Sequence, residues 1–233
     1  MFILKQYLKF FTIIICFSSI AISNNRTVLT NCHIISCVDK KIQRDMTIKI
    51  DGNRISRIYK GRYEEKNDNW EVIDLNGAYV LPGLWNVHMH LTALLPDPNR
   101  IQDNESIASA TIRAGLNAMD GIRHGFTSIR SVGERDYIDV AWRDIFNQGY
   151  YMGPRIFASG EAVTVTGGHR GDVEFGSDGV YEIRKSVRGR IQNGVDWIKI
   201  VDVEMLPDEL DAAIKTTHSL GRKITSHSRE PAT

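Results

Sequence analysis

Residues 26–80 consist of short segments in which apolar and polar positions alternate, a pattern typical of half-buried strands. The predicted strands cover residues 27–35, 47–50, 54–59 and 70–75. The sequence Asp51-Gly52-Asn53 predicts a hairpin turn between two of them, and Asn76-Gly77 predicts a second turn. We therefore expect residues 24–80 to form a small N-terminal β-domain, a segment of β-sandwich type.

From residue 79 onward, short apolar strands alternate with longer segments of helical period. After a first strand that ends in His88 and His90, strands are predicted at residues 127–132, 155–159, 197–201 and 223–227. Helices are predicted at about residues 106–122, 136–148, 178–194 and 207–221. The positions expected to face inward on the last two helices are Val180, Ile183, Val187, Ile191, Leu210, Ile214 and Leu220. This alternation favours an α/β fold, with a parallel sheet and helices outside it.

The composition is that of an ordinary globular protein and argues against nucleic-acid binding. The 233 residues carry 29 Lys and Arg against 28 Asp and Glu, so there is no basic excess, and 42% of the residues are hydrophobic. Beyond the N-terminal leader the cysteines are Cys32 and Cys37, which lie on opposite faces of one predicted strand. We expect free, half-buried thiols, and a single disulfide is left open.

Residues 1–23 have the outline of a secretory signal peptide. Two lysines precede an apolar stretch at residues 10–22, which is shorter than the roughly 20 residues that a membrane span needs. We expect a secreted protein without a stable membrane span after cleavage, and an uncleaved anchor is the alternative. Asn25 and Asn104 each begin an Asn-x-Ser/Thr glycosylation motif.

The strand that follows Pro82-Gly83 ends in His88 and His90, which point to the same side because side chains alternate along a strand. Two imidazoles placed in this way can hold one metal ion, although a pair of unrelated strand histidines remains the alternative. Lys199 and His227 come at the ends of later predicted strands, where the catalytic and metal-binding residues of (β/α) barrels lie. For Lys199 the alternative is an ion pair with an acid such as Asp202.

Two further side chains are candidates for substrate binding. His169 lies in a glycine-rich loop after the third predicted strand, where it could contact either a substrate or solvent. Arg130 ends the second strand and could meet a carboxylate. We assign structural roles to His33, within a strand, and to His124 and His218, at helix ends.

Six short groups of residues follow one another along the chain. Their order and spacing together are more specific than any one of the groups. The groups are Leu81-Pro82-Gly83 with His88-Met89-His90, His124-Gly125-Phe126-Thr127-Ser128-Ile129-Arg130, Gly153-Pro154-Arg155-Ile156, Thr166-Gly167-Gly168-His169, Asp196-Trp197-Ile198-Lys199-Ile200 and Ile224-Thr225-Ser226-His227. With them the chain resembles the amidohydrolase superfamily over roughly residues 26–233, with the closest likeness to its imidazolonepropionase and Xaa-Pro dipeptidase-like members. The resemblance implies a TIM-like (β/α) barrel at residues 81–233 and a metal-dependent hydrolase of C–N bonds.

The resemblance also implies roles for the candidate residues. His88 and His90 would bind the more buried of two divalent metal ions, Lys199 would be carbamylated and bridge both ions, and His227 would bind the second. Zinc is the expected metal. The substrate would be a small molecule or a dipeptide, attacked by a metal-activated water; amides, cyclic amides, dipeptides and organophosphate-type esters stay open.

The family pattern requires more chain than these residues supply. A complete barrel has eight strands, and about five are predicted here. By the resemblance, a further metal-binding histidine and the catalytic aspartate would follow Thr233. We therefore expect a truncated chain that is inactive and poorly soluble alone, with homo-oligomers possible for a full-length form. The alternatives are a non-catalytic metal-binding or interaction protein and an unrelated α/β protein with structural histidines.

Overall fold

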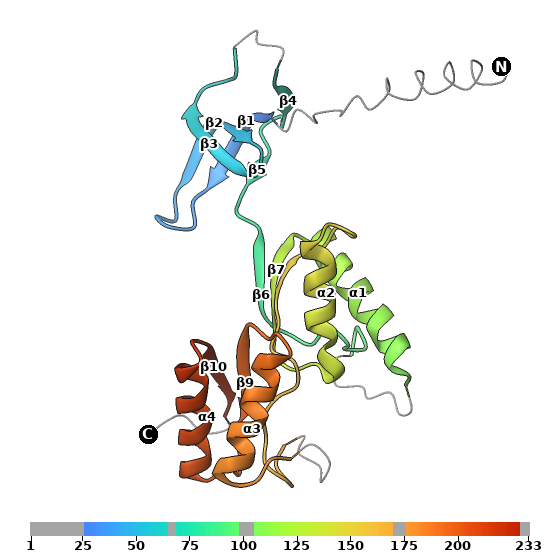
Figure 1. Cartoon of the computed structure of the whole chain (residues 1–233). Helices are drawn as coiled ribbons and strands as arrows, with labels where there is room; N and C mark the ends of the chain where they lie inside the picture. The colour runs from blue at the N-terminus through green and yellow to red at the C-terminus, as the bar shows by residue number, and fades with distance from the viewer. Residues whose placement is uncertain (1–25, 65–68, 98–104, 170–175, 229–233) are drawn as a thin grey trace, which may run out of the picture. The chain divides into compact units, whose positions relative to one another are not determined.

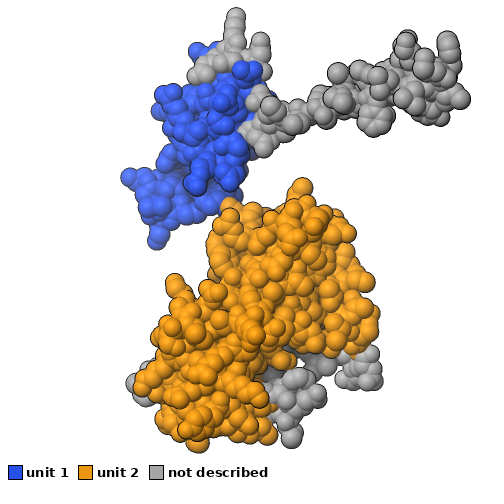
Figure 2. Space-filling model, in the orientation of Figure 1, with its two compact units in different colours: residues 1–82 blue, residues 83–233 orange. Residues whose placement is uncertain are grey.

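The computed structural model describes residues 26–64, 69–97, 105–169 and 176–228. The chain divides into two compact units, Met1–Pro82 and Gly83–Thr233 (Figure 2). The predicted signal peptide and the predicted glycosylation acceptors Asn25 and Asn104 lie outside the described residues. No helix in the described ranges is long and apolar enough to cross a membrane.

The first unit is a sheet of five short strands. They are β1 (Arg26–Ile35), β2 (Ile42–Asp51), β3 (Arg54–Lys60), β4 (Glu71–Asp74) and β5 (Tyr79–Val80). The order is β3-β2-β1-β4, and β5 also pairs with β1. As the turn signal predicts, β2 and β3 form a hairpin in which Asp51 pairs with Arg54. The described strands of this unit lie in one sheet, so the sandwich stays a prediction.

The two cysteines differ in position more than the sequence suggests. Cys32 is fully buried beside Met46 and Ile48, whereas Cys37 lies in the turn after β1 and is exposed. Both thiols are free, which confirms that expectation. Their placement on one strand as half-buried groups was wrong, because β1 ends at Ile35.

The second unit alternates strands and helices (Figure 1). Its strands are β6 (Leu84–Met89), β7 (Phe126–Ser131), β8 (Arg155–Phe157), β9 (Trp197–Val201) and β10 (Lys223–His227). Its helices are α1 (Ile107–Arg123), α2 (Ile138–Asn147), α3 (Gly179–Gln192) and α4 (Pro207–Ser219), with a short 3-10 turn at Arg135–Tyr137. The mixed α/β class predicted from the sequence is confirmed.

The strands of this unit are parallel and follow one another in chain order. β6, β7 and β8 form one ladder, and β9 pairs with β10. Between the ladders, Asp196 donates its backbone N–H to the Ala158 carbonyl, and Val163 forms a parallel bridge to Ile200. The carboxyl ends of the parallel strands therefore point the same way, which is what gathers the site.

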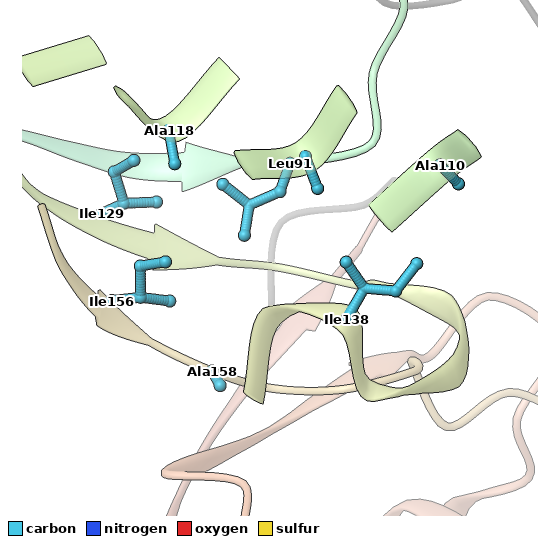
Figure 3. Close-up of a cluster of buried hydrophobic side chains, with 8 residues drawn as sticks. Leu91, Ala110, Ala118, Ile129, Ile138, Ile156 and Ala158 are labelled. Carbon is cyan, nitrogen blue, oxygen red and sulfur yellow. The ribbon is translucent and has the colours of Figure 1, made fainter. Parts of the chain in front are cut away.

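Two apolar clusters hold the helices against the strands. One contains Leu91, Ile129 and Ile156 together with alanines of α1 (Figure 3), and the other contains Ile183, Val187, Ile198 and Ile200. Burial of Ile183 and Val187, with Val180 and Ile191 packed beside them, confirms the predicted inner face of α3.

Two helix predictions were wrong in detail. The second helix starts at Ile138 instead of residue 136, because Asp136 and Tyr137 have positive φ angles of 55° and 54° and cannot continue an α-helix. Leu220 does not face inward, since α4 ends at Ser219 and Leu220 is the half-exposed C-cap residue. Instead, α4 buries small residues: Ala212, Ala213, Thr216 and Thr217.

Candidate metal and substrate site

A cavity of about 540 Å³ lies in the second unit where β6, β9 and β10 end or approach their ends. Its wall contains all four predicted metal ligands, His88, His90, Lys199 and His227, and also His169. In the β9–β10 ladder Lys199 pairs with Thr225, which comes two residues before His227. Lys199 therefore lies two residues further than His227 from the carboxyl end of the ladder. Residues up to 139 positions apart in the sequence thus meet in one cavity (227 − 88 = 139).

The first two histidines lie at the irregular end of β6. The rings of His88 and His90 are 5.6 Å apart with an interplanar angle of 69°. The register against β7 shifts between Asn86 and Met89, and the Asn86 side chain accepts a hydrogen bond from the backbone N–H of His88 at 3.1 Å. His90 Nδ1 lies 2.9 Å from the carbonyl oxygen of Gly133. Because a carbonyl only accepts, Nδ1 carries a proton, and in the neutral imidazole the lone pair is then on Nε2.

The surroundings of His88 favour its neutral form. Burial lowers the pKa of His88, and the positive charges of His90, Lys199, Arg130 and His227 lower it further. A neutral imidazole has the lone pair that a metal ion needs.

Lys199 is 5% exposed, and burial followed by the charge of Arg130 lowers the pKa of its amine, while Asp202 partly opposes this shift. Among the described residues, no carboxylate lies within ion-pair distance of Lys199. Asp202 therefore acts on Lys199 through its charge, at a distance beyond that of an ion pair. A lowered pKa favours the neutral amine, which is the form that reacts with carbon dioxide.

His169 and His227 lie next to each other in the cavity wall. Their rings are stacked, 5.0 Å apart and 14° from parallel. Thr164 donates its hydroxyl to the carbonyl of His169 at 3.4 Å, which fixes the start of the glycine-rich loop. His169 therefore lies beside a predicted metal ligand.

Comparison with known proteins identifies the family of this chain. The model of the amidohydrolase family matches residues 79–232, which include His88, His90, His169, Lys199 and His227. The chain belongs to the amidohydrolase family.

The proteins similar to this amidohydrolase chain extend beyond the region that they share with it. An ochratoxinase of Aspergillus niger is 25% identical over 192 residues, 64% of this chain and 38% of that protein. A dihydroorotase of Anoxybacillus flavithermus is 32% identical over 106 residues, 46% of this chain and 21% of that protein. A crystal structure of a Xaa-Pro dipeptidase with bound methionine is 28% identical with a TM-score of 0.79, and covers 87% of this chain and 56% of that chain. This chain thus spans about half the length, or less, of these relatives.

Arg130 of this amidohydrolase chain does not line the cavity. Its Nε donates to the Val87 carbonyl at 2.7 Å, and its guanidinium carbon lies 4.9 Å from the centre of the Trp197 ring. The guanidinium acts on the site through its charge, which lowers the pKa values of both His88 and Lys199. A contact between Arg130 and a substrate carboxylate stays a prediction.

Sequence reasoning missed Glu134, a cavity residue that is 2% exposed. Its carboxylate accepts hydrogen bonds from the backbone N–H groups of Leu91 and Thr92 and from the Thr92 hydroxyl. Burial raises the pKa of Glu134 to about 7, and the nearby charge of Asp139 adds to this shift. The available signal was its position three residues after β7, where the strand-end rule also applies.

The donor set fits a metal ion in part. Within the described ranges, no three His, Cys, Asp or Glu side chains are grouped closely enough to hold one. The candidate set instead contains the imidazoles of His88, His90 and His227 and the amine of Lys199, all of which line the cavity. Imidazole suits zinc, and a carbamylated Lys199 would add anionic oxygens, which a lysine ammonium cannot offer.

Proposed function

We propose that this chain carries part of the active site of a metal-dependent hydrolase of C–N bonds. The observation that supports it most directly is the meeting of His88, His90, Lys199 and His227 at one cavity inside the region that matches the amidohydrolase family. The family relationship supports hydrolysis as the reaction, and the residues at the cavity supply the chemical groups for it.

The proposed roles follow from the state of each side chain. His88 presents an imidazole whose pKa is lowered by burial, and the His90 ring is held by the Gly133 carbonyl. The neutral amine of Lys199 attacks carbon dioxide, loses a proton and becomes a carbamate anion. His227 completes the set from β10, and His169 beside it contacts the substrate. Two divalent ions, for which zinc is our proposal, would supply Lewis acidity and lower the pKa of a water.

The cavity wall suits a substrate with an apolar part. Beside the histidines it contains Met89, Leu95, Val132 and Val201. The relatives include an ochratoxinase, a dihydroorotase and a Xaa-Pro dipeptidase. We propose an amide, cyclic amide or dipeptide substrate, with secretion directed by residues 1–23, a (β/α) barrel around the cavity and homo-oligomers open for a longer form.

A metal-binding measurement combined with a hydrolysis assay tests the proposal. The whole chain is loaded with zinc in bicarbonate buffer, and zinc per chain is measured beside hydrolysis of Xaa-Pro dipeptides, N-acyl amino acids and cyclic amides. We expect His88→Ala and Lys199→Ala to lose bound zinc and turnover. His124→Ala, an exposed histidine at the end of α1, serves as the matched control. Equal zinc content in His88→Ala and the parent chain would contradict the proposal.

A non-catalytic metal-binding protein is the second candidate. It rests on the same His88, His90 and His227 at the cavity and does not require Lys199 to be carbamylated. Zinc binding that His88→Ala abolishes, without turnover of any substrate in the panel, would favour this candidate over the hydrolase.

A further inference from the structure

Glu134 joins the segment after β7 to the segment after β6. Its Oε1 accepts the backbone N–H of Leu91, and its Oε2 accepts the Thr92 hydroxyl at 2.7 Å. The N–H of Thr92 lies 3.3 Å from both carboxylate oxygens. Both oxygens of this buried carboxylate are thus used on two consecutive residues, and these residues directly follow His90.

The residues before Glu134 hold the same segment at two more points. Val132 donates its N–H to the Met89 carbonyl at 3.0 Å, and the Gly133 carbonyl lies 2.9 Å from His90 Nδ1. Glu134 itself donates its N–H to the Gly160 carbonyl at 2.9 Å, which anchors it to the segment after β8. Residues 132–134 therefore contact residues 89–92 on both sides of His90.

These hydrogen bonds lie where the backbone pairing between β6 and β7 ends. The last β6–β7 pair is Met89 with Ser131, and it follows a register shift. His90 lies one residue beyond β6, so the strand no longer fixes its backbone. Gly133 has a φ of +142°, which residues with a side chain rarely adopt, so glycine permits the backbone conformation that places its carbonyl at the His90 ring.

We propose that Glu134 is a positioning residue for His90. By fixing Leu91 and Thr92 it keeps the imidazole at the Gly133 carbonyl, so Nδ1 holds the proton and Nε2 faces outward as a ligand. Groups that orient a metal-binding histidine in this way commonly change metal affinity by about 10–100-fold. The effect on metal rests on the proposed function, whereas the effect on the His90 ring does not.

The first measurement uses the metal-free chain. Nitrogen-15 NMR of labelled histidine, with the His90 signals assigned by their loss in His90→Gln, reports which ring nitrogen carries the proton. We expect a single Nδ1–H tautomer in the parent chain and a mixture in Glu134→Ala. Glu134→Gln keeps one acceptor and should restore much of the single tautomer. If Glu134→Ala does not fold, Glu134→Leu, which fills a similar volume without an acceptor, replaces it in the comparison.

Glu209 provides a matched control outside the cavity. It is also a buried glutamate, and it accepts the backbone N–H groups of Gly179 and Leu206 at 2.6 Å and 2.8 Å. Glu209→Ala should lose stability while the His90 tautomer stays unchanged. An unchanged tautomer in the folded Glu134 variant that lacks an acceptor, or an equal change in Glu209→Ala, would overturn the proposal.

The second measurement separates this inference from the proposed function. Zinc titration of the same variants should give about 10–100-fold weaker binding for Glu134→Ala than for Glu209→Ala. If the tautomer changes but the parent chain binds no zinc, the proposed function fails and the positioning role stands. Tight zinc binding that is equal in both variants would overturn the role of Glu134 at the metal.

Discussion

The guanidinium of Arg143 on α2 lies 3.0 Å from the carboxylate of Asp196, the residue directly before β9. The same carboxylate oxygen accepts the backbone N–H of Ala158 at 2.8 Å, and Arg143 also donates to the Gly194 carbonyl at 2.6 Å. One acidic side chain thus joins the segment after β8 to the start of the strand that carries Lys199.

Asp196→Ala should lower the free energy of unfolding by about 1–2 kcal/mol. The change removes the acceptor for Ala158 and leaves the largely buried Arg143 without this partner, while partial exposure of the aspartate moderates the loss. Urea unfolding followed by tryptophan fluorescence measures it. The control is Asp144→Ala, which removes the other, half-exposed acid on Arg143 and should cost less than about 0.5 kcal/mol. Equal losses would refute the assignment.

Gly115→Ala should destabilise the contact between α1 and α2 by about 1–3 kcal/mol, because overpacking displaces a fixed side chain. A Cβ at Gly115 would lie 2.0 Å from Trp142, whose indole donates to the Thr111 carbonyl at 2.7 Å. Gly189→Ala on α3 meets nothing within 4 Å and should instead stabilise by about 0.5–1 kcal/mol. Thermal unfolding of the two variants compares them, and a shift of the same sign in both would contradict the packing argument.

The pKa of Glu134 predicts a pH dependence of stability. Burial raises this pKa from 4.5 to about 7, so between these values the folded chain binds the proton more tightly than the unfolded chain. The free energy of unfolding should therefore fall as pH rises from 4.5 to 7, and Glu134→Gln should remove that part of the fall.

Glu105 gives a control of opposite sign for this pH series. A hydrogen bond from Arg113 lowers the pKa of Glu105, so this acid stabilises the fold above pH 4.5 and loses its contribution as pH falls through the lowered value. Glu105→Gln should change the acid limb of the stability curve. Urea titrations at pH 3 to 8 measure both, and a Glu134→Gln curve parallel to the parent between pH 4.5 and 7 would count against the burial argument.

Arg130 should promote carbamylation of Lys199. Its charge lowers the pKa of the lysine amine, so more of the amine is neutral at a given pH, and the same charge attracts the carbamate anion. Carbon-13 NMR in labelled bicarbonate should show a carbamate signal that grows with pH, weakens in Arg130→Met and vanishes in Lys199→Met. Lys223, exposed on the neighbouring strand, is the control, and loss of the signal in Lys223→Met instead would reassign it.

Much of the fold follows from local patterns. The hairpin at Asp51–Arg54, the strands of the second unit and the inner face of α3 all come from periodicity and turn residues, which act over a few positions. The errors at Asp136 and Leu220 are of another kind. Both lie at helix ends, where backbone angles and neighbouring segments outweigh the apolar period.

The residues of the candidate site also divide into those that local patterns predict and those that depend on distant contacts. The strand-end rule selects His88, His90, Lys199 and His227 from the sequence, because parallel strands carry their carboxyl ends to one edge. The rule gave no role to Glu134 and assigned Arg130 to the mouth of the site. The contacts of both are with distant backbone groups, at Leu91 and Val87, which no local pattern encodes.

The sequence by itself determined which side chains could serve a metal ion and on which strands they lie, since residue chemistry and strand period are local properties. The tertiary structure decided how those side chains are held. In the folded chain Lys199 is buried, and the Gly133 carbonyl lies within hydrogen-bonding distance of His90 Nδ1. The Glu134 carboxylate accepts a hydrogen bond from Leu91, the residue after His90. Those features depend on desolvation and on hydrogen bonds between residues 43 positions apart, and both arise only when the strands assemble.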